Sequence, residues 1–291
     1  MNEDELIVVN HDKCIKCGLC VEICPIKALG MSDNGPETIM PGACNSCGHC
    51  VAICPHEAID HKKNHLADQV DLKSNLVIDA EMAYQFLRSR RSTRYFKDVA
   101  VAKEQLMQLL DVAHYAPTAS NRQGISYIVV DDKKVIERAT EIVIEWMEQE
   151  VKTKAITHWS FPYHLRMFRE KGMDTILRKA PSFILAISEN GLAKARENTI
   201  FSLAYLELFA PALGLGSCWA GLFEMCAFSE YKPLLDLFRI PENYKITGAV
   251  MVGYPKYKFK RLVSRQPLNV MWMSEPKNSA KVDSCVSGSI Y

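Results

Sequence analysis

Eight cysteines between residues 14 and 54 form two copies of one spacing. The first copy starts at Cys14 and the second at Cys44, and each reads Cys-x-x-Cys-x-x-Cys-x-x-x-Cys-Pro. Three thiolates spaced in this way can surround one iron–sulfur cubane on a loop. Gly18 and Gly48 allow the backbone to turn tightly around it. The repeat therefore predicts metal clusters.

Zinc sites and disulfides are the alternatives, but zinc takes four ligands, usually at other spacings, and disulfides need an oxidising compartment. The segment resembles bacterial two-cluster ferredoxins along nearly its whole length. This resemblance implies two [4Fe–4S] clusters, and the fourth cysteine of each copy then serves the other cluster. The implied ligands are Cys14, Cys17, Cys20 and Cys54 for one cluster, and Cys44, Cys47, Cys50 and Cys24 for the other. His49, between two ligands, is expected to be a surface residue.

Two basic clusters lie farther along the chain. Residues 90–96 read Arg-Arg-Ser-Thr-Arg-Tyr-Phe, and residues 256–261 hold four basic side chains after Gly253-Tyr254-Pro255. Either cluster could be a solvated face. Arginine forks beside hydroxyl groups also suit a phosphate, which carries nearly two negative charges at neutral pH. We therefore expect both clusters to close on one anion.

Two turn-rich segments lie between the basic clusters. Residues 116–123 (APTASNRQ) offer amide groups that could read the edge of a heterocycle. Residues 213–221 (LGLGSCWAG) offer backbone N–H groups that could approach a flat ring. A nicotinamide-binding fingerprint is not evident, because Gly214-x-Gly216 lacks the rest of the G-x-G-x-x-G spacing.

In type and order, these four segments resemble the nitroreductase family of FMN flavoproteins, specifically members with an N-terminal ferredoxin domain. The resemblance implies that Arg90, Arg91 and Ser92 hold the FMN phosphate from one side and Lys260 and Arg261 from the other. It implies that Arg94 lies near the pyrimidine edge of the flavin. It implies that the 116–123 segment packs on the flavin, often from the partner subunit, through Thr118, Ser120 and Asn121, with Pro117 and Gln123 beside them. It implies that the chain runs along the ring at Trp219, Ala220 and Gly221, with one backbone N–H facing N5. The resemblance also implies a homodimer with FMN at the interface.

The positioning elements follow from hydrophobic periodicity. We expect helices over 81–90, 102–115, 133–150, 196–213 and 228–239, and strands over 126–130, 183–187 and 247–252. The predicted fold class is α+β: an α/β/α layered flavin domain at 80–291, a small ferredoxin-like domain at 1–62 and a connector at 63–79. A loop within residues 151–175 is expected to shape the substrate pocket, with Trp159, Phe161 and Tyr163 lining it or covering a surface groove. Cys218 is expected to pack in the core.

Composition limits the possible partners and compartment. The 291 residues carry a net charge of +1, so nothing favours nucleic-acid binding. No secretory signal begins the chain, which predicts a cytoplasmic protein. Residues 200–223 are apolar enough to suggest a membrane span, yet Pro211, Gly214 and Gly216 interrupt them, so a buried or interface helix is expected.

The leading hypothesis is an oxidoreductase. Clusters that carry single electrons would feed FMN from a low-potential donor, either ferredoxin or NAD(P)H, and the flavin would reduce a nitroaromatic, quinone or similar electron-poor acceptor. Dehydrogenation or dehalogenation on the same fold, and a non-enzymatic electron carrier, are the alternatives. No catalytic nucleophile or general base is identifiable in the sequence. A flavin reductase does not require one, because a proton can come from water.

Overall fold

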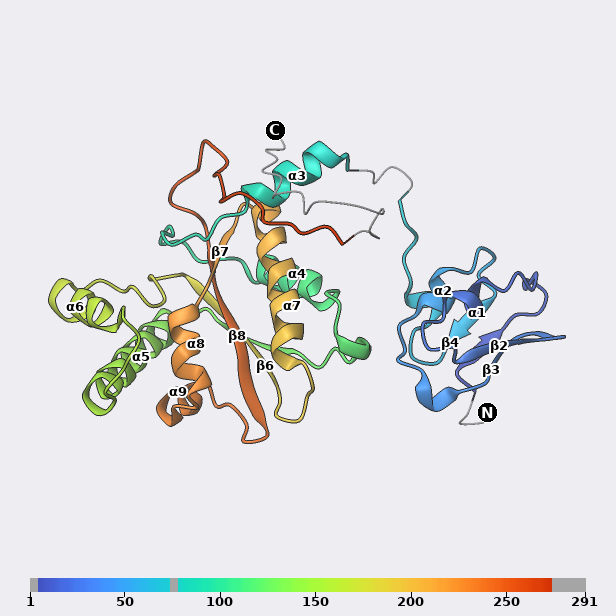
Figure 1. Ribbon diagram of the computed structural model, residues 1–291, viewed down its shortest axis with the longest axis horizontal. Coiled ribbons are helices and arrows are strands. Elements are labelled where there is room, and N and C mark those ends of the chain that lie inside the picture. The colour runs from blue at the N-terminus through green and yellow to red at the C-terminus, as the bar shows by residue number, and fades with distance from the viewer. Residues whose placement is uncertain (1–4, 74–77, 274–291) are drawn as a thin grey trace, which may run out of the picture.

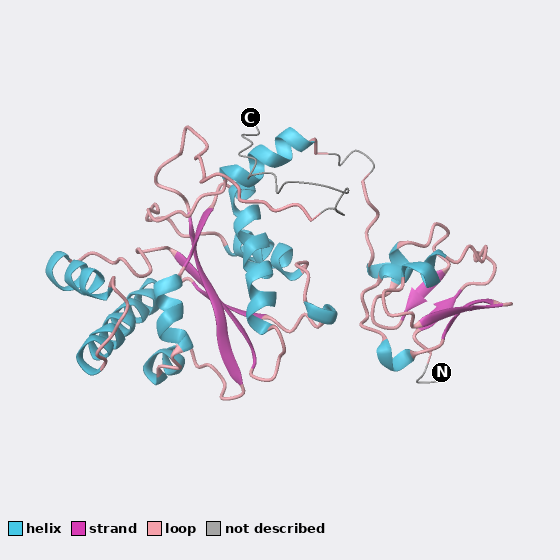
Figure 2. Ribbon diagram, in the orientation of Figure 1, coloured by secondary structure: helices cyan, strands magenta, loops and turns pink. Residues whose placement is uncertain are grey.

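The computed structural model describes residues 5–73 and 78–273. An N-terminal unit of short strands and helices is followed by a larger unit of helices around one sheet (Figures 1 and 2). Cys285 and the predicted end of the flavin domain lie outside the described residues.

The N-terminal unit is built from two antiparallel strand pairs and short helices. β1 (Ile7–Val9) pairs with β4 (Ile59–His61), and β2 (Leu29–Ser32) pairs with β3 (Gly35–Thr38). The helices are α1 (Leu19–Ile23) and α2 (His49–Ala52), with 3-10 turns η1 (Pro41–Ala43) and η2 (Leu66–Asp68). A small core of Ile7, Cys20, Leu29, Val51 and Ile59 joins them. Such a core is small for an independent unit, so bound metal is expected to add stability.

The larger unit contains an antiparallel sheet in the order β5-β6-β8-β7. Its strands are β5 (Ser126–Val130), β6 (Ser182–Glu189), β7 (Gly216–Trp219) and β8 (Tyr244–Gly253). Its helices are α3 (Ala80–Ser89), α4 (Lys103–His114), α5 (Lys133–Thr153), α6 (Phe161–Lys171), α7 (Ala195–Phe209), α8 (Gly221–Phe228) and α9 (Lys232–Leu237), with 3-10 turns η3 (Ala119–Asn121) and η4 (Ala210–Leu213).

Helices cover both faces of this sheet. Along β6, Phe183 and Leu185 face a core shared with α5, α8 and α9, whereas Ile184 and Ala186 face a second core shared with α4 and α7. Successive strand residues point to opposite faces, so a strand buried on both sides reads as a continuous apolar run. The layered α+β prediction is confirmed.

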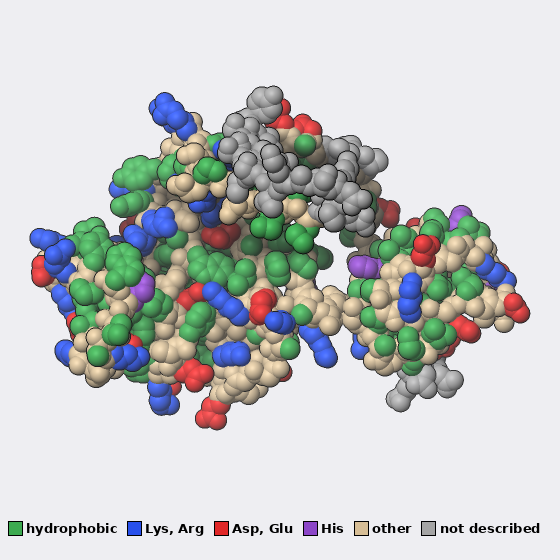
Figure 3. All heavy atoms as spheres, viewed as in Figure 1, with side chains coloured by type: hydrophobic (Ala, Val, Ile, Leu, Met, Phe, Trp, Pro, Cys, Tyr) green, Lys and Arg blue, Asp and Glu red, His purple; other side chains and the backbone are tan. Residues whose placement is uncertain are grey.

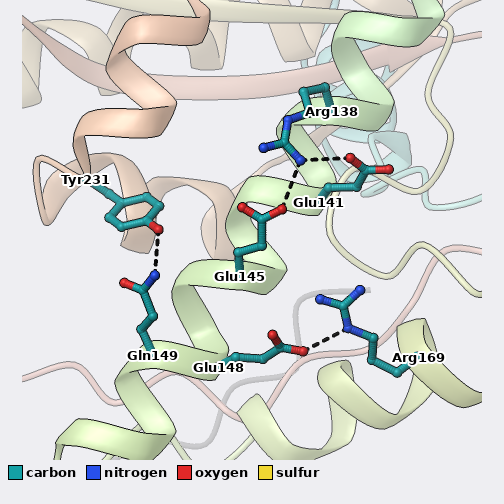
Figure 4. Close-up of polar contacts among 7 residues, drawn as sticks. All are labelled: Arg138, Glu141, Glu145, Glu148, Gln149, Arg169 and Tyr231. Carbon is teal, nitrogen blue, oxygen red and sulfur yellow. Dashed lines mark hydrogen bonds and ion pairs between the residues drawn. The ribbon is translucent and has the colours of Figure 1, made fainter.

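Polar contacts fix the long helix α5 at its start and along its exposed side. The Asp132 carboxylate accepts a hydrogen bond from the Lys134 backbone N–H at 2.8 Å, which caps the helix. Arg169 on α6 pairs with Glu148 at 2.8 Å, and Gln149 donates to the Tyr231 hydroxyl at 3.0 Å (Figure 4). These contacts join α5 to its neighbours.

Three predicted elements differ from the structure. The predicted helix 228–239 is wrong at its start, because α8 ends at Phe228 and α9 begins only at Lys232. Residues 216–219 form strand β7 rather than a loop, because they pair with β8. The predicted helix 196–213 ends as an α-helix at Phe209 and continues as a 3-10 turn through Pro211. Across the described residues, no helix is both long and apolar enough to cross a membrane.

Candidate functional site

The eight N-terminal cysteines line two cavities. We name as cavity one the space lined by Cys14, Cys17, Cys20 and Cys54, and as cavity two the space lined by Cys24, Cys44, Cys47 and Cys50. Three cysteines of each set come from one copy of the repeat and the fourth from the other copy. In the described residues, no three His, Cys, Asp or Glu side chains converge as a single-ion site would require. The cysteines instead surround two separate spaces.

The local backbone explains how each cysteine loop turns. Gly18 and Gly48 adopt φ values of 82° and 75° directly before α1 and α2, a region that residues with a Cβ adopt at a cost. Backbone N–H groups point at the fourth cysteines: Ala28 donates to Cys24 Sγ and Ala58 to Cys54 Sγ, both at 3.2 Å. Donors aimed at sulfur suit anionic, metal-bound thiolates.

Burial makes a bare thiolate costly in these cavities. It raises the pKa of Cys50 to about 11 and also raises the pKa of Cys20. A positively charged metal beside such a sulfur offsets that cost, so the donor set fits iron better than free thiols. His49 is exposed on α2, as expected of a surface residue, and borders cavity two.

The first basic cluster lies against the Gly-rich segment. The Thr93 backbone N–H donates to the Ser217 carbonyl at 2.8 Å, and Ser92 bridges to Ser217 as a parallel strand would. A side chain at Gly216 would collide with Thr93 and Pro255. Glycine is therefore required where these segments meet, and the fold brings together parts of the chain that are far apart in sequence.

A cavity of about 580 Å³ opens beside this junction. We name it the basic cavity; its charged lining residues are Arg90, Arg91, Lys97, Lys258 and Glu207. The buried Arg91 Nε atom has no hydrogen-bond partner among the described residues, and its guanidinium lies 5.0 Å over the Phe259 ring. A buried donor without a partner is costly, so the cavity fits an anion that would accept from Arg91.

Glu207 is the acidic member of this cavity. Arg90 Nη1 lies 3.6 Å from its carboxylate, and the Ser217 hydroxyl donates to the same oxygen at 3.1 Å. Burial raises the pKa of Glu207, although the charge of Arg90 opposes that shift. Part of the Arg90 charge is therefore balanced within the protein, which leaves Arg91 and the lysines for a bound anion.

The other predicted phosphate residues lie elsewhere. Lys260 and Arg261 are exposed and are outside the lining of the basic cavity, to which the same chain segment contributes Lys258. Arg94 lines a neighbouring cavity of about 440 Å³ together with Arg178 and Lys256. Ser92 lies beside Cys218, whose pKa is raised by burial and lowered by the nearby Arg94 charge. Cys218 is 4% exposed, so its predicted packing role is confirmed.

The segment predicted to run along the flavin ring starts at the end of β7. Trp219 is half-buried beneath the Arg196 guanidinium at 5.2 Å, and Arg196 in turn forms a two-pronged ion pair with the buried Glu224. The Ala220 N–H is occupied, because it donates to the Ala249 carbonyl at 2.9 Å. Gly221 is the first residue of α8, and helices leave their first N–H groups without an intrahelical partner. Its N–H therefore has no partner within its own helix.

The 116–123 segment forms a tight turn near the N-terminal unit. The Thr118 hydroxyl accepts from the Gln123 N–H at 2.9 Å, while Pro117 and Ser120 are exposed. The Asn121 side-chain amide donates to the backbone carbonyls of Asn45 at 3.1 Å and Ser46 at 2.9 Å. Asn45 borders cavity two. The turn therefore connects the larger unit to one cysteine cavity.

The predicted pocket aromatics separate in the structure. Phe161 is 2% exposed and packs against Trp146 with ring centroids 5.4 Å apart, so its predicted pocket or groove role is wrong. Phe161 begins α6, and its side chain packs into the core. Residues 161–171 are therefore a helix, and the loop predicted within residues 151–175 is wrong over that range. Trp159 is 85% exposed and Tyr163 49% exposed, and both remain available to a substrate.

Sequence reasoning missed two kinds of residue. Lys97 and Glu207 reach the basic cavity from separate parts of the chain, and no local pattern groups them with the basic cluster at residues 256–261. His61, at the end of β4, is 2% exposed and places Nε2 3.6 Å from Cys44 Sγ. The 30-residue repeat contains a signal for it, because His61 stands where the first copy has Met31.

Comparison with known proteins identifies both units. The nitroreductase family model matches residues 87–254, and a 4Fe–4S dicluster domain model matches residues 6–55. A putative NADH dehydrogenase/NAD(P)H nitroreductase of Archaeoglobus fulgidus is 26% identical over 60% of this chain and 87% of its own length. An iodotyrosine deiodinase of Thermotoga neapolitana is 27% identical over 60% of this chain and 89% of its own length.

A solved structure shares the fold. The nitroreductase with bound FMN from Bacteroides fragilis superimposes with a TM-score of 0.54 at 20% identity, over 65% of this chain and 98% of its own. The family match spans more than half of the chain and includes strands β5 to β8 and the first basic cluster, residues 90–96. The chain therefore belongs to the nitroreductase family of FMN-dependent oxidoreductases and carries a 4Fe–4S dicluster ferredoxin domain ahead of the family domain.

Proposed function

We propose that this chain holds two [4Fe–4S] clusters that pass electrons to FMN. The reduced FMN then reduces nitroaromatic, quinone or similar electron-poor acceptors. The observation that carries the proposal is the bond from Asn121 to the Asn45–Ser46 loop. It ties the turn predicted to pack on the flavin to the rim of cavity two. Bound clusters supply single electrons and bound flavin supplies two-electron or hydride chemistry, so contact between their sites suits transfer.

The proposed cluster ligands are the cysteines of cavities one and two, four to each. The exchange of the fourth cysteine between repeats is supported by the lining of the cavities, in which Cys54 joins the first copy and Cys24 the second. Tight backbone turns at Gly18 and Gly48 and N–H donors to sulfur hold each ligand set.

The proposed FMN site joins the basic cavity to the end of β7. Arg91 and Lys258 bind the phosphate, and Glu207 holds Arg90 beside them. The buried Nε of Arg91 has no partner in the part of the chain that the structure describes. The Gly221 N–H donates to N5. Arg94 orients the pyrimidine edge, where its positive charge favours the anionic reduced ring. The remaining proposed contacts to FMN come from Ser92, Pro117, Thr118, Ser120, Gln123, Trp219, Ala220, Lys260 and Arg261.

The proposed assembly is a homodimer. No residue of α3 is buried, although Met82, Phe86 and Leu87 give it an apolar side. On α7, Ile200, Phe201 and Tyr205 are each at least 40% exposed, and Figure 3 shows hydrophobic side chains gathered over α4 and α7. Exposed apolar patches of this kind mark interaction surfaces. A second copy of the chain would cover the apolar sides of α3 and α7.

Reductive dehalogenation is the second candidate. It rests on the relative named iodotyrosine deiodinase, which matches the flavin domain about as well as the relative named nitroreductase does. Both reactions need an electron-poor substrate stacked on reduced flavin, and the exposed Trp159 and Tyr163 are suited to either. Turnover with a nitroarene, a quinone and a halogenated phenol, each assayed anaerobically, separates the two candidates.

The test of the electron path compares two proteins. A chain starting at residue 78 keeps the whole sheet and the basic cavity. It should bind FMN, accept electrons from dithionite and retain any turnover driven directly by NAD(P)H. It should lose most turnover driven by reduced ferredoxin. If the shortened chain keeps its ferredoxin-driven rate, the clusters are not the entry route for electrons.

A further inference from the structure

The two copies of the cysteine repeat differ at a buried position beside the ligand sets. Met31 ends the first copy and lines cavity one, and His61 ends the second copy and lines cavity two. Other equivalent lining positions also differ, and His56 of cavity one stands where cavity two has Ile26, but His56 is exposed. Met31 is 42% exposed, whereas His61 is 2% exposed. The repeat therefore places a buried imidazole beside one ligand set only.

The hydrogen bonds of His61 determine which ring nitrogen carries the proton. The Lys63 backbone N–H donates to His61 Nδ1 at 3.0 Å, so Nδ1 is the acceptor of the ring. A neutral imidazole whose Nδ1 accepts carries its hydrogen on Nε2. Nε2 lies 3.6 Å from Cys44 Sγ, within the range of an N–H···S bond. His61 is therefore positioned to donate to a proposed cluster ligand.

The donors shared by both cavities do not distinguish them. Ala28 and Ala58 occupy equivalent repeat positions and donate to the fourth cysteines at the same distance. Cavity one has basic neighbours, Lys13 and Lys16. The Lys13 amine lies 3.9 Å from the exposed Glu57 carboxylate, and the Lys16 amine donates to the Asp33 carbonyl. Water screens such exposed charges, whereas a buried donor acts directly on sulfur.

We propose that His61 sets the reduction potential of the cluster in cavity two, raising it through the Nε2–H donor to Cys44 Sγ, while the cluster in cavity one lacks this contribution. Reduction adds one electron to a cluster, and the added negative charge strengthens a hydrogen bond to its sulfur. The donor therefore stabilises the reduced form more than the oxidised form. This inference rests on the proposed function, because it requires a [4Fe–4S] cluster in each cavity.

Cavity two is the cysteine cavity that contacts the larger unit, so a raised reduction potential there bears on electron transfer to the flavin. Asn45 and Ser46, which accept the bonds from Asn121, belong to the cysteine loop that borders cavity two. A raised potential there favours holding an electron in the cavity next to the flavin domain. His61 acts through Cys44 and is therefore a positioning residue rather than a catalytic one.

The test measures the two potentials separately in full-length holoprotein. A potentiometric titration followed by EPR and by the hyperfine-shifted cysteine proton resonances assigns a potential to each cluster. His61→Met places the residue of the first repeat copy in the second. It should lower the reduced-to-oxidised ratio of the cavity-two cluster about tenfold at a given applied potential, equivalent to about 59 mV for one electron. The cavity-one cluster should not shift.

Two further variants separate hydrogen bonding from packing. Met31→Leu, the matched control, should leave both potentials unchanged, and His61→Gln, which keeps an N–H donor, should recover part of the loss. An unchanged cavity-two potential in His61→Met, or equal shifts in both clusters, overturns the inference. The iron and sulfide content of each protein is measured first. A content too low for two clusters would count against the two-cluster proposal, whereas the potentials of fully loaded protein test the role of His61. If His61→Met does not assemble, wild-type protein labelled with ¹⁵N-histidine decides: a nitrogen coupling to the reduced cavity-two cluster supports the bond, and its absence overturns it.

Discussion

The side-chain amide nitrogen of Asn121 lies 2.9 Å from the backbone carbonyl oxygen of Ser46, so the flavin domain donates a hydrogen bond to the cysteine loop of cavity two. Asn64, shortly after β4, donates to the same carbonyl. One backbone oxygen is therefore shared between a bond that holds the loop and a bond that joins the two domains. Asn121 adopts φ 52°, a conformation that asparagine tolerates better than most residues.

Asn121→Ala removes both bonds across this junction without changing either cluster set. We expect ferredoxin-driven flavin reduction to slow severalfold, because the two sites lose their fixed contact. The two bonds are neutral, and each contributes about 1 kcal/mol. Stopped-flow absorbance at the flavin band measures the rate. The rate driven directly by NAD(P)H serves as the internal comparison and should fall less, because it does not use the junction; an equal fall in both rates would point to damage to the flavin site instead.

Cys54→Ser should damage the cluster in cavity one, although Cys54 belongs to the second copy of the repeat. The reason is that Cys54 lines cavity one together with Cys14, Cys17 and Cys20. EPR of the reduced protein, with iron content measured in parallel, reports the loss. Cys24→Ser is the matched variant and should damage the cluster in cavity two. Loss confined to cavity two in Cys54→Ser would refute the ligand assignment.

The cysteine cavities could be predicted from sequence because the repeat is local and its spacing is nearly the whole geometry. The order of helices and strands was also readable, since the buried strands β6 and β8 are continuous apolar runs. β7 was missed because its four residues, Gly216–Trp219, are too few for a period to be seen. Only pairing with β8 makes them a strand.

In contrast, the residues that line the basic cavity could not be identified individually from the sequence. The sequence correctly marks residues 256–261 as basic, but it does not indicate which side chains turn inward, and Lys258 rather than Lys260 lines the basic cavity. The ion pair of Arg196 with Glu224 spans α7 and α8 and also binds the Ala249 N–H. Contacts of this kind depend on packing between elements distant in sequence. Hydrophobic periodicity predicts single helices and strands and does not indicate which of them pack together.

Arg91→Ala should weaken FMN binding by about 10- to 100-fold, because it removes a charge-assisted contact of about 1.5–3 kcal/mol. Riboflavin lacks the phosphate and should lose far less affinity. Arg261→Ala, at an exposed position outside the basic cavity, should have the smaller effect on FMN of the two. Fluorescence titration of deflavinated protein with each flavin measures these affinities. Equal losses for FMN and riboflavin in Arg91→Ala would make this arginine part of a solvated face.

Glu207→Gln should stabilise the protein at neutral pH, and the gain should depend on pH. Burial raises the pKa of Glu207 above 4.5, so the folded state favours the protonated carboxyl. A raised carboxyl pKa contributes stability below the unfolded value, and that contribution is lost as pH rises through the folded value. The free energy of unfolding of the native protein should therefore fall relative to the variant from about pH 4.5 upward, then level off above the folded pKa.

Glutamine suits this test because its amide oxygen can still accept the hydrogen bond from the Ser217 hydroxyl, so packing is retained. Urea unfolding followed by tryptophan fluorescence, at saturating FMN and at several pH values between 5 and 8, gives the difference between the two proteins. Ser217→Ala, which removes that donor but leaves the carboxyl, is the control and should keep the pH dependence. A difference between the native protein and Glu207→Gln that is flat with pH would mean that Arg90, 3.6 Å away, fully compensates the buried charge.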